Sequence, residues 1–235
     1  MTQKEIILII ASHPDDEILG CGGTIAKYSR QGAEVYPVIL AEGATSRGLT
    51  KGLNRNSKKN PELKNLKEAA KNAAKILGTE IPIFLNFPDN QLDKIPLLKI
   101  IQKIEPIIKK IKPNILWTHH GYDINIDHQI THQAAITAAR ALPGSSIQQI
   151  LFFETPSSTD YQIQSTQTAF LAQWFEDITS TLELKMKALE AYHLEMRAWP
   201  HLRSYEAIEA LAKYRGAMAG FCAAEAFMLG RKMVA

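Results

Sequence analysis

The sequence has few cysteines, little excess charge and no long apolar segment. Its two cysteines, Cys21 and Cys222, stand in no CxxC or other ligand spacing, so neither a disulfide framework nor a cysteine-based metal site is indicated. We therefore expect two buried thiols in a reducing compartment. The formal charge is only +3, and the basic residues are dispersed. A nucleic-acid partner is therefore not expected.

The first apolar run, residues 6–11, is too short for a signal sequence or for a helix that crosses a bilayer. No other stretch reaches that length without charges, and internal repeats and low-complexity segments are lacking. We expect a cytoplasmic protein with no membrane anchor. Of the 235 residues, 46% are hydrophobic and 22% charged, which is typical of a soluble globular protein. We therefore predict a single domain that spans residues 1–235, with a helical portion from about residue 180 onward.

Short β-branched runs alternate with amphipathic segments along the first two thirds of the chain. The predicted strands are 6–11, 34–41, 81–85, 115–118 and 150–153, and the predicted helices are 14–30, 61–78, 96–111 and 128–142. The last third predicts a strand at 174–178 and helices at 182–195 and 205–229. Such alternation predicts an α/β fold with a doubly wound, mostly parallel, Rossmann-like sheet and a helical C-terminal extension. Ligands of such sheets bind beyond the carboxyl ends of the strands, so residues that follow strands are the site candidates.

Ionisable residues follow the first predicted strand, in the segment His13-Pro14-Asp15-Asp16-Glu17. His13 and Asp16 are three apart, so both side chains can face one side of a helical turn. One imidazole and one carboxylate make two of the three protein ligands of a catalytic zinc site. Asp15 would then be free to take a proton from a water molecule. Helix capping alone explains one acidic residue here, but not a histidine with two carboxylates.

A glycine-rich segment, Gly20-Cys21-Gly22-Gly23, raises the alternative of dinucleotide binding. It lies several residues inside the predicted helix, and the third glycine of G-x-G-x-x-G would fall on Ile25. Close packing of a helix on the sheet explains these glycines better.

Four of the seven histidines lie between residues 119 and 132. His128 is nearest the start of the predicted helix and so nearest the sheet edge, where it can supply a third metal ligand. His132 shares its face, but Gln129 occupies the place of the glutamate that a zincin metalloprotease needs, and we expect His132 to pack within the fold. His119 and His120 are either exposed loop residues or contacts to substrate or to the transition state.

Three further features are candidates for substrate contact. Asp89 follows the third strand and either binds sugar hydroxyls or is a turn residue in Pro-Asp-Asn. Arg47 lies in the polar loop after the second strand, where it can meet an anionic group, although a solvated arginine is the default. A cluster rich in histidine, arginine and tryptophan at residues 193–203 forms either a loop over the site or an oligomer contact.

Together these segments resemble the PIG-L/LmbE-like N-deacetylase family. Residues 13–17 match its first signature, and Asn125-Ile126-Asp127-His128 resembles its second, His-Pro-Asp-His. The segments 87–89, 215–216 and 224–227 also look like those of many bacterial members, so the resemblance covers nearly the whole chain.

The resemblance implies that His13, Asp16 and His128 bind Zn²⁺, or another divalent metal, and that Asp15 is the general base. It also implies catalytic roles at positions 125 and 127, here Asn125 and Asp127. The implied reaction is the removal of an N-acetyl group from an amino sugar, sugar conjugate or similar small molecule. Relatives are often oligomeric, which makes a homo-oligomer an expectation here as well.

The second signature departs from the family at Asn125, where members have histidine. Asparagine can donate a hydrogen bond to an oxyanion but cannot relay a proton at neutral pH. The proton for the departing amine must then come from protonated Asp15 or from His119 or His120. Two alternatives stay open: an amidase that cleaves a larger N-acyl conjugate, and a non-catalytic sugar- or nucleotide-binding protein on the same fold.

Overall fold

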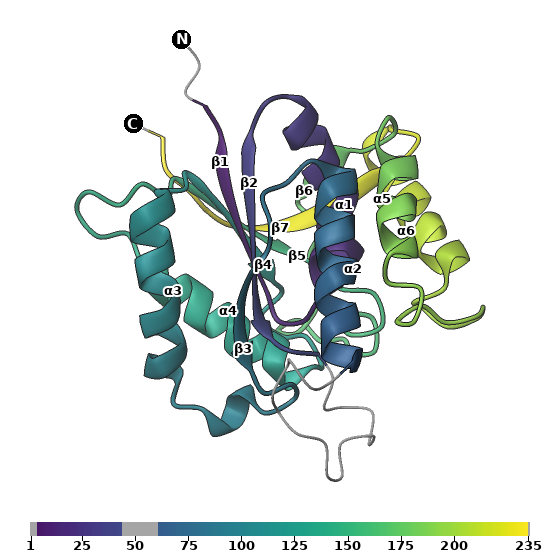
Figure 1. The fold of residues 1–235 in the computed structure, drawn as a ribbon. Coiled ribbons are helices and arrows are strands. Elements are labelled where there is room, and N and C mark those ends of the chain that lie inside the picture. The colour runs from purple at the N-terminus through teal and green to yellow at the C-terminus, as the bar shows by residue number, and fades with distance from the viewer. Residues whose placement is uncertain (1–3, 44–60, 235) are drawn as a thin grey trace.

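A single twisted sheet organises the part of the chain that the computed structural model describes, residues 4–43 and 61–234 (Figure 1). Within this part its seven strands are β1 (Ile6–Ala11), β2 (Glu34–Ala41), β3 (Ile83–Phe87), β4 (Ile115–His119), β5 (Gln149–Phe153), β6 (Trp174–Asp177) and β7 (Ala224–Lys232). Their order is β3-β2-β1-β4-β5-β7-β6. The first five are parallel, whereas β7 is antiparallel to both β5 and β6. The predicted α/β fold with a mostly parallel sheet is therefore confirmed.

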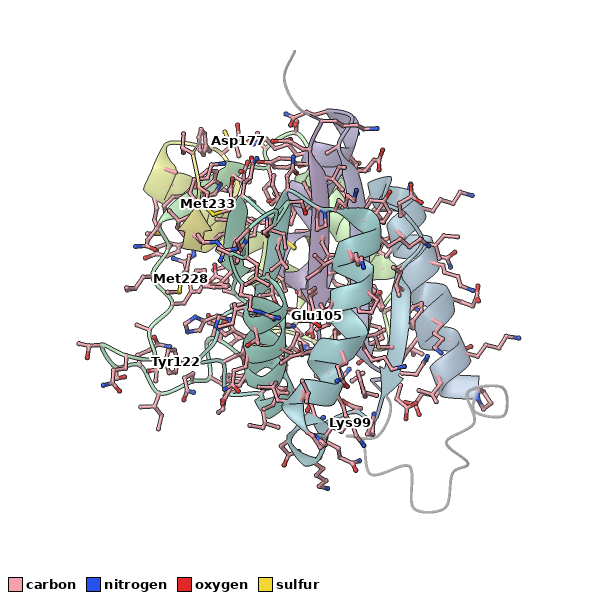
Figure 2. The ribbon with its side chains drawn as sticks, turned by 90° about the vertical axis from the view of Figure 1, so that its left-hand side faces the viewer. Lys99, Glu105, Tyr122, Asp177, Met228 and Met233 are labelled. Atoms are coloured by element: carbon pink, nitrogen blue, oxygen red, sulfur yellow. The ribbon has the colours of Figure 1, made fainter. Side chains whose placement is uncertain are left out.

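Helices cover both faces of the sheet. They are α1 (Asp16–Arg30), α2 (Pro61–Leu77), α3 (Leu97–Ile111), α4 (Ile126–Ala138), α5 (Leu182–Glu190) and α6 (Tyr205–Ala219), with a 3₁₀ turn η1 at Leu92–Lys94. Helices α3 and α4 lie on one face, and α1, α2, α5 and α6 on the other (Figure 1). Lys99 and Glu105 mark the outer surface of α3 (Figure 2), while Ile100 and Ile104 of the same helix are buried.

The central strand β1 is buried on both faces. Ile7 and Ile9 pack into the core under α1, α2 and α5, while Leu8 and Ile10 pack into the core under α3 and α4. A strand buried on two faces carries a continuous apolar run rather than an alternating pattern. This explains why residues 6–11 are apolar without interruption.

The glycines at the start of α1 let this helix approach the sheet closely. A Cβ atom at Gly20 would overlap the ring of Phe153 on β5 and would lie 3.0 Å from the backbone oxygen of Glu154. A Cβ atom at Gly23 would lie 2.7 Å from Ile178. These contacts support the packing explanation of the glycines over a dinucleotide-binding loop.

The predicted helix at 205–229 is wrong in its last part. Helix α6 ends at Ala219, where Gly220 takes a left-handed conformation with φ of 79°. Residues 224–232 then form β7, which lies between β5 and β6 in the sheet. The segment is rich in Ala, Glu, Met and Leu, which favour helices, but tertiary pairing overrides that local preference.

Glu225 fixes β7 against two helices. Its buried carboxylate accepts hydrogen bonds from the backbone N–H groups of Gly23 and Thr24, at 3.0 and 2.7 Å, and pairs with Lys185 of α5 at 2.6 Å. A buried carboxylate is tolerated when hydrogen bonds and an opposite charge compensate its lost hydration. This network therefore joins the C-terminal third of the chain to the helix that carries the first motif.

Three other expectations from the sequence can be compared directly with the structure. Cys21 is buried and Cys222 is exposed, so the expectation of two buried thiols is wrong for Cys222; both are free. Helix α4 begins two residues before the predicted start and ends at Ala138. Within the described residues, no helix has the length and apolar character needed to cross a membrane.

We expect Gly20→Ala to lower the free energy of unfolding by about 2 kcal/mol, because the added methyl group forces apart α1 and β5. Urea denaturation measures this. In a Phe153→Leu background the same substitution should cost less, since the ring that it would meet is gone. An equal cost in both backgrounds would contradict the proposed contact.

Candidate active site

The turn that follows β1 holds an unusual backbone conformation. Asp15 has a φ of 114°, a region that side chains rarely adopt. Two hydrogen bonds hold this turn: the His13 N–H donates to Asp16 Oδ2 at 2.8 Å, and the Asp15 N–H donates to Glu17 Oε2 at 3.2 Å. The turn thereby places His13, Asp15 and Asp16 directly after the end of β1. Strained residues of this kind concentrate at functional sites.

The loop after β4 brings the second motif to the same place. Strands β1 and β4 are parallel neighbours, so their carboxyl ends meet. Asn125 caps α4, because its Oδ1 accepts the N–H of Asp127 at 2.9 Å. This cap explains why the helix begins at Ile126, and it places His128 in the first turn, toward the end of β1.

His13, Asp16 and His128 converge at one buried point. Asp16 Oδ2 lies 3.2 Å from His13 Nδ1 and 3.2 Å from His128 Nε2. One candidate ligand atom from each residue lies within 4.8 Å of the other two. Asp16 Oδ1 and both ring nitrogens of His128 are buried and have no hydrogen-bond partner in the described part of the chain. Unsatisfied buried polar atoms of this kind call for a missing partner, and a metal ion fits.

Two further carboxylates lie behind these rings. His13 Nε2 lies 3.1 Å from Asp127 Oδ2, so with a metal bound Nε2 would carry the proton and Nδ1 would face the ion. His128 Nδ1 lies 3.1 Å from Asp123 Oδ2, so with a metal bound Nδ1 would face this carboxylate and Nε2 would face the ion. Carboxylates behind histidine ligands are a regular feature of protein metal sites.

Two other groups could be considered as metal sites, but their atoms already have partners. In the group of His119, Asp123 and His128, His119 Nε2 accepts the N–H of Ser12 at 2.9 Å. In the group of His13, Asp89 and Asp127, the two Asp127 oxygens accept backbone N–H groups from η1 and the residues before it, at 2.7 and 3.0 Å. The first group therefore fits a metal ion better than the other two.

Burial and mutual charge shift the pKa values of this cluster. Burial acts to raise the pKa of Asp16, but the positive charge of His128 and the close contacts with His128 and His13 hold it well below its ordinary value. His119 is neutral here, because burial lowers its pKa well below the usual value and its Nε2 accepts the Ser12 N–H. Burial acts to lower the pKa of His128, but Asp16 and Asp123 raise it to about 9. His13 behaves like His128: its contacts with Asp127 and Asp16 raise its pKa well above the usual value despite burial. Without a cation, these imidazoles therefore carry the positive charge that Asp16 requires.

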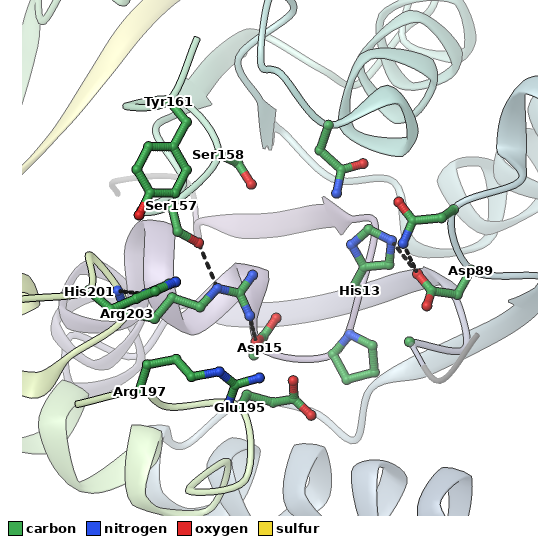
Figure 3. Close-up of a pocket in the computed structure, with 14 residues that line it drawn as sticks. His13, Asp15, Asp89, Ser157, Ser158, Tyr161, Glu195, Arg197, His201 and Arg203 are labelled. Atoms are coloured by element: carbon green, nitrogen blue, oxygen red, sulfur yellow. Dashed lines mark hydrogen bonds and ion pairs between the residues drawn. The ribbon is translucent and has the colours of Figure 1, made fainter. Parts of the chain in front are cut away.

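An open cavity of about 280 Å³ lies against this cluster (Figure 3). Its lining residues come from six separate parts of the described chain and are His13, Pro14, Asp15, Gly43, Asp89, Asn90, Asn125, Ser157, Ser158, Tyr161, Glu195, Arg197, His201 and Arg203. Most are polar. Of the five described residues other than glycine with positive φ, three line this cavity: Asp15, Asn90 and Ser157.

Asp15 is the carboxylate of this cavity nearest in sequence to the metal candidates. Burial raises its pKa to about 7, although Arg203, whose Nη1 lies 2.8 Å from Asp15 Oδ2, acts to lower it. A carboxylate with a pKa near neutrality can both accept and return a proton at physiological pH.

The structure places the two predicted acidic residues Asp127 and Asp89 behind and beside His13. Asp127 is fully buried and does not line the cavity, so it lies where it can hold His13 rather than contact substrate. Asp89 lines the cavity, with its Oδ1 3.0 Å from His13 Nε2. This position is compatible with both roles considered for Asp89, which are binding of sugar hydroxyls and a turn residue.

His119 and His120 are not in a loop that faces solvent. Both are buried, and neither lines the cavity. His119 stacks on His128, with ring centroids 3.9 Å apart, and His120 Nε2 lies 3.0 Å from the backbone oxygen of Thr168. These positions suit a role in holding the candidate metal ligands in place, without contact to the cavity. Arg47 lies outside the described residues.

Two groups of residues at this site were not singled out from the sequence. Asp123 stands five residues before His128, and the frequent pairing of carboxylates with metal-bound histidines could have indicated it. Ser157 and Tyr161 come from the segment after β5, for which no signature exists. From the cluster at residues 193–203, Arg197, His201 and Arg203 lie in the cavity wall, as the hypothesis of a loop over the site requires.

The protein is thus a doubly wound α/β protein with a candidate metal centre at the edge of its sheet. This centre is the buried group of His13, Asp16 and His128, which lies beneath a polar cavity. The family model PIG-L: GlcNAc-PI de-N-acetylase matches residues 8–139, more than half of the chain. The chain therefore belongs to this family, and the prediction of a deacetylase-family enzyme is confirmed.

The chain is 32% identical over 196 residues to the uncharacterized deacetylase YaiS of Escherichia coli, which covers 81% of this chain and 91% of YaiS. It is 29% identical to the diacetylchitobiose deacetylase of Thermococcus kodakarensis, over 93% of this chain and 80% of that protein. Among solved structures, GalB, the 4-carboxy-2-hydroxymuconate hydratase of Pseudomonas putida, aligns with a TM-score of 0.76 at 23% identity, over 98% of both chains. At that identity the likeness shows the fold alone, and the fold is thus shared by proteins named for different reactions.

We expect Asp123→Asn to weaken zinc binding by about 10- to 100-fold, because His128 loses the carboxylate behind its Nδ1. Competition with a chromogenic chelator measures the affinity. Asp93→Asn, at an exposed position in η1, serves as the control and should bind zinc as the unmodified protein does. Equal affinity of both variants would show that Asp123 does not support the site.

Metal binding should release protons. A pKa of about 9 keeps His128 protonated at pH 7.5 in the metal-free protein, and the raised pKa of His13 favours its protonated form, so a metal must displace these protons. We expect release of about two protons per ion and an affinity that falls as the pH is lowered from about 9. Calorimetric titration in buffers of different ionisation enthalpy counts the protons. A count near zero would contradict the protonated state of the two rings.

Proposed function

We propose that this protein is a zinc-dependent hydrolase that removes an N-acetyl group from an amino sugar, a sugar conjugate or a similar small molecule. The observation that carries the proposal is the position of Asp15, a buried carboxylate at the cavity wall, directly beside the converging group of His13, Asp16 and His128. Membership of the de-N-acetylase family and the relatives named as deacetylases support it.

His13, Asp16 and His128 would hold the metal ion. Two imidazole nitrogens and one carboxylate oxygen are a ligand set that zinc commonly takes in catalytic sites. When bound, zinc would act as a Lewis acid that lowers the pKa of a water molecule and polarises the acyl carbonyl group. Another divalent metal with the same ligand preferences is the alternative.

Asp15 is proposed as the general base. It accepts the proton of the attacking water while that water adds to the acyl carbon. Because burial raises its pKa to about 7, protonated Asp15 is an acid of suitable strength to donate this proton to the departing amine. The same residue can thus serve as base and then as acid, which answers the question raised by asparagine at position 125.

Asn125 is proposed to stabilise the oxyanion. Its Oδ1 is occupied by the N–H of Asp127, so its Nδ2 group, which carries two N–H donors, is the end left for the cavity. A fixed donor costs no reorganisation when negative charge develops on the acyl oxygen. The helix cap therefore orients the amide for this role.

The lining of the cavity suits a polar substrate. Ser157, Ser158 and Tyr161 offer hydroxyl groups, and Asp89 and Asn90 offer carboxylate and amide groups. Such groups bind sugar hydroxyls, whereas a long aliphatic acyl chain would leave them without partners. The diacetylchitobiose deacetylase of T. kodakarensis is named for a sugar substrate, which supports the same class.

A panel of N-acetylated amino sugars and sugar conjugates tests the proposal. Purified protein loaded with zinc should release acetate and a free primary amine in equal amounts, and treatment with a chelator should stop the release until zinc is restored. Release of larger acids from N-acyl conjugates instead would favour the amidase alternative. Binding of sugars or nucleotides without turnover would favour the non-catalytic alternative.

We expect Asp15→Asn to keep zinc and to lower kcat by about 100- to 10,000-fold, the usual contribution of a general base. The amide has nearly the same shape but cannot accept the proton. Metal content by atomic spectroscopy and steady-state kinetics measure the two effects. Asp93→Asn again provides a matched control on the surface. Full activity of Asp15→Asn would show that another group is the base.

Several expectations concern the protein outside this site. The single domain over residues 1–235, the cytoplasmic location, the lack of a nucleic-acid partner and the homo-oligomeric state stay predictions. Light scattering of the purified protein measures the oligomeric state directly.

A further inference from the structure

Arg203 reaches the catalytic motif from the far end of the chain. It lies in the segment between α5 and α6, immediately before Ser204, whose hydroxyl caps α6. Its N–H donates to His201 Nδ1 at 3.0 Å, and its backbone oxygen accepts the N–H of Arg197 at 3.2 Å. The helix cap and this short loop fix the backbone from which the side chain extends.

The guanidinium group joins two walls of the cavity. Its Nη1 donates to Asp15 Oδ2 at 2.8 Å, and its Nε donates to Ser157 Oγ at 2.8 Å (Figure 3). Because a guanidinium is planar and its donors have fixed directions, two bonds to different groups set its orientation. A lysine ammonium in the same place would supply the charge but not the two directions.

The contact divides the two oxygens of Asp15 between two tasks. Oδ2 is taken by Arg203, so Oδ1 is the oxygen left to meet the attacking water. The backbone of this residue is already fixed in its strained conformation by the bond from its N–H to Glu17, which also accepts the hydroxyl of Tyr192 at 3.1 Å. Arg203 therefore fixes the remaining freedom, the rotation of the carboxylate. A general base must stand within hydrogen-bond reach and in a narrow orientation to work well.

Arg203 and Ser157 both lie beyond residues 8–139, the part that the family model matches. Since Asp15 lies inside that part, the base and the group that holds it come from different portions of the chain.

We propose that Arg203 is the positioning residue of Asp15: it holds Oδ2, with Ser157 as its second anchor, so that Oδ1 faces the attacking water. The inference rests on the proposed function, since it assigns a task to Arg203 within that reaction. Ser157→Ala should loosen the same arrangement in a milder way.

The test compares Arg203→Ala, Arg203→Lys and Ser157→Ala in zinc-loaded protein. We expect kcat of Arg203→Ala to fall by about 100-fold, the effect of a small misplacement of a reacting group, while KM and zinc content stay within about twofold. Guanidinium ion at millimolar concentration should restore part of that kcat, and Arg203→Lys should remain low. Ser157→Ala should lose several-fold. Arg140→Ala, which removes an exposed arginine paired with Glu105, controls for loss of an arginine as such.

Two results would overturn the inference. One is an unchanged kcat in Arg203→Ala, or a loss that guanidinium ion does not restore. The other is a loss of the same factor when Arg203→Ala is made in the Asp15→Asn protein, since a residue that acts through Asp15 should have nothing further to lose there.

A measurement without turnover separates this inference from the proposed function. In metal-free protein, Arg203→Met and Asp15→Asn should each lower Tm, and the double variant should lose less than the sum of the two, because both ends of one buried ion pair are then removed. Additive losses would contradict the pairing even if no deacetylated product were found. Coupled losses in a protein that deacetylates nothing would leave the pairing intact and the proposed function in error.

Discussion

The site depends on the burial of one carboxylate, Asp16, among imidazole rings. The carboxylate is inaccessible to solvent, and the rings of His13, His128 and His119 lie 3.2, 3.2 and 3.4 Å from its Oδ2. An isolated carboxylate in such a place would be very costly, so positive charge must always accompany it. In the metal-free protein the raised pKa values of His13 and His128 favour that charge on these two rings, and a metal ion can replace their protons. The parallel pairing of β1 with β4 is what brings the groups together.

The cavity above this carboxylate has two parts of different origin. The part that carries the proposed chemistry, from His13 to His128, lies within the residues that the family model matches. The opposite wall comes from the segment after β5 and from the loop between α5 and α6. Loops on a rigid scaffold are the usual place for differences in specificity. The second wall also holds Arg203 and Ser157, so in our proposal it positions Asp15 as well as lining the cavity.

The sequence was sufficient for the features that depend on local spacing. His13 and Asp16 share a turn because they are three residues apart, and His128 follows from the expectation that parallel strands end at one edge. The role of Asp127 was not accessible, because the backbone groups that fix its carboxylate come from residues 35 and 37 positions earlier in the chain. The contact of Arg203 with Asp15 spans 188 residues, a separation over which no local pattern carries information. The strand β7 was missed for a related reason: its residues favour helix locally, and only pairing with distant strands makes it extended.

The place of β7 in the sheet has a consequence for synthesis on the ribosome. Strand β6 joins the sheet only through β7, although β6 is made about fifty residues earlier. The five parallel strands can assemble as the nascent chain emerges, and α5 can pack on α1 and α2, but β6 must wait for β7. During that interval one edge of β5 and the backbone of β6 lack their partner strand. Unpaired strand edges can pair with other chains, so the nascent protein is most exposed to aggregation just before its last strand is made.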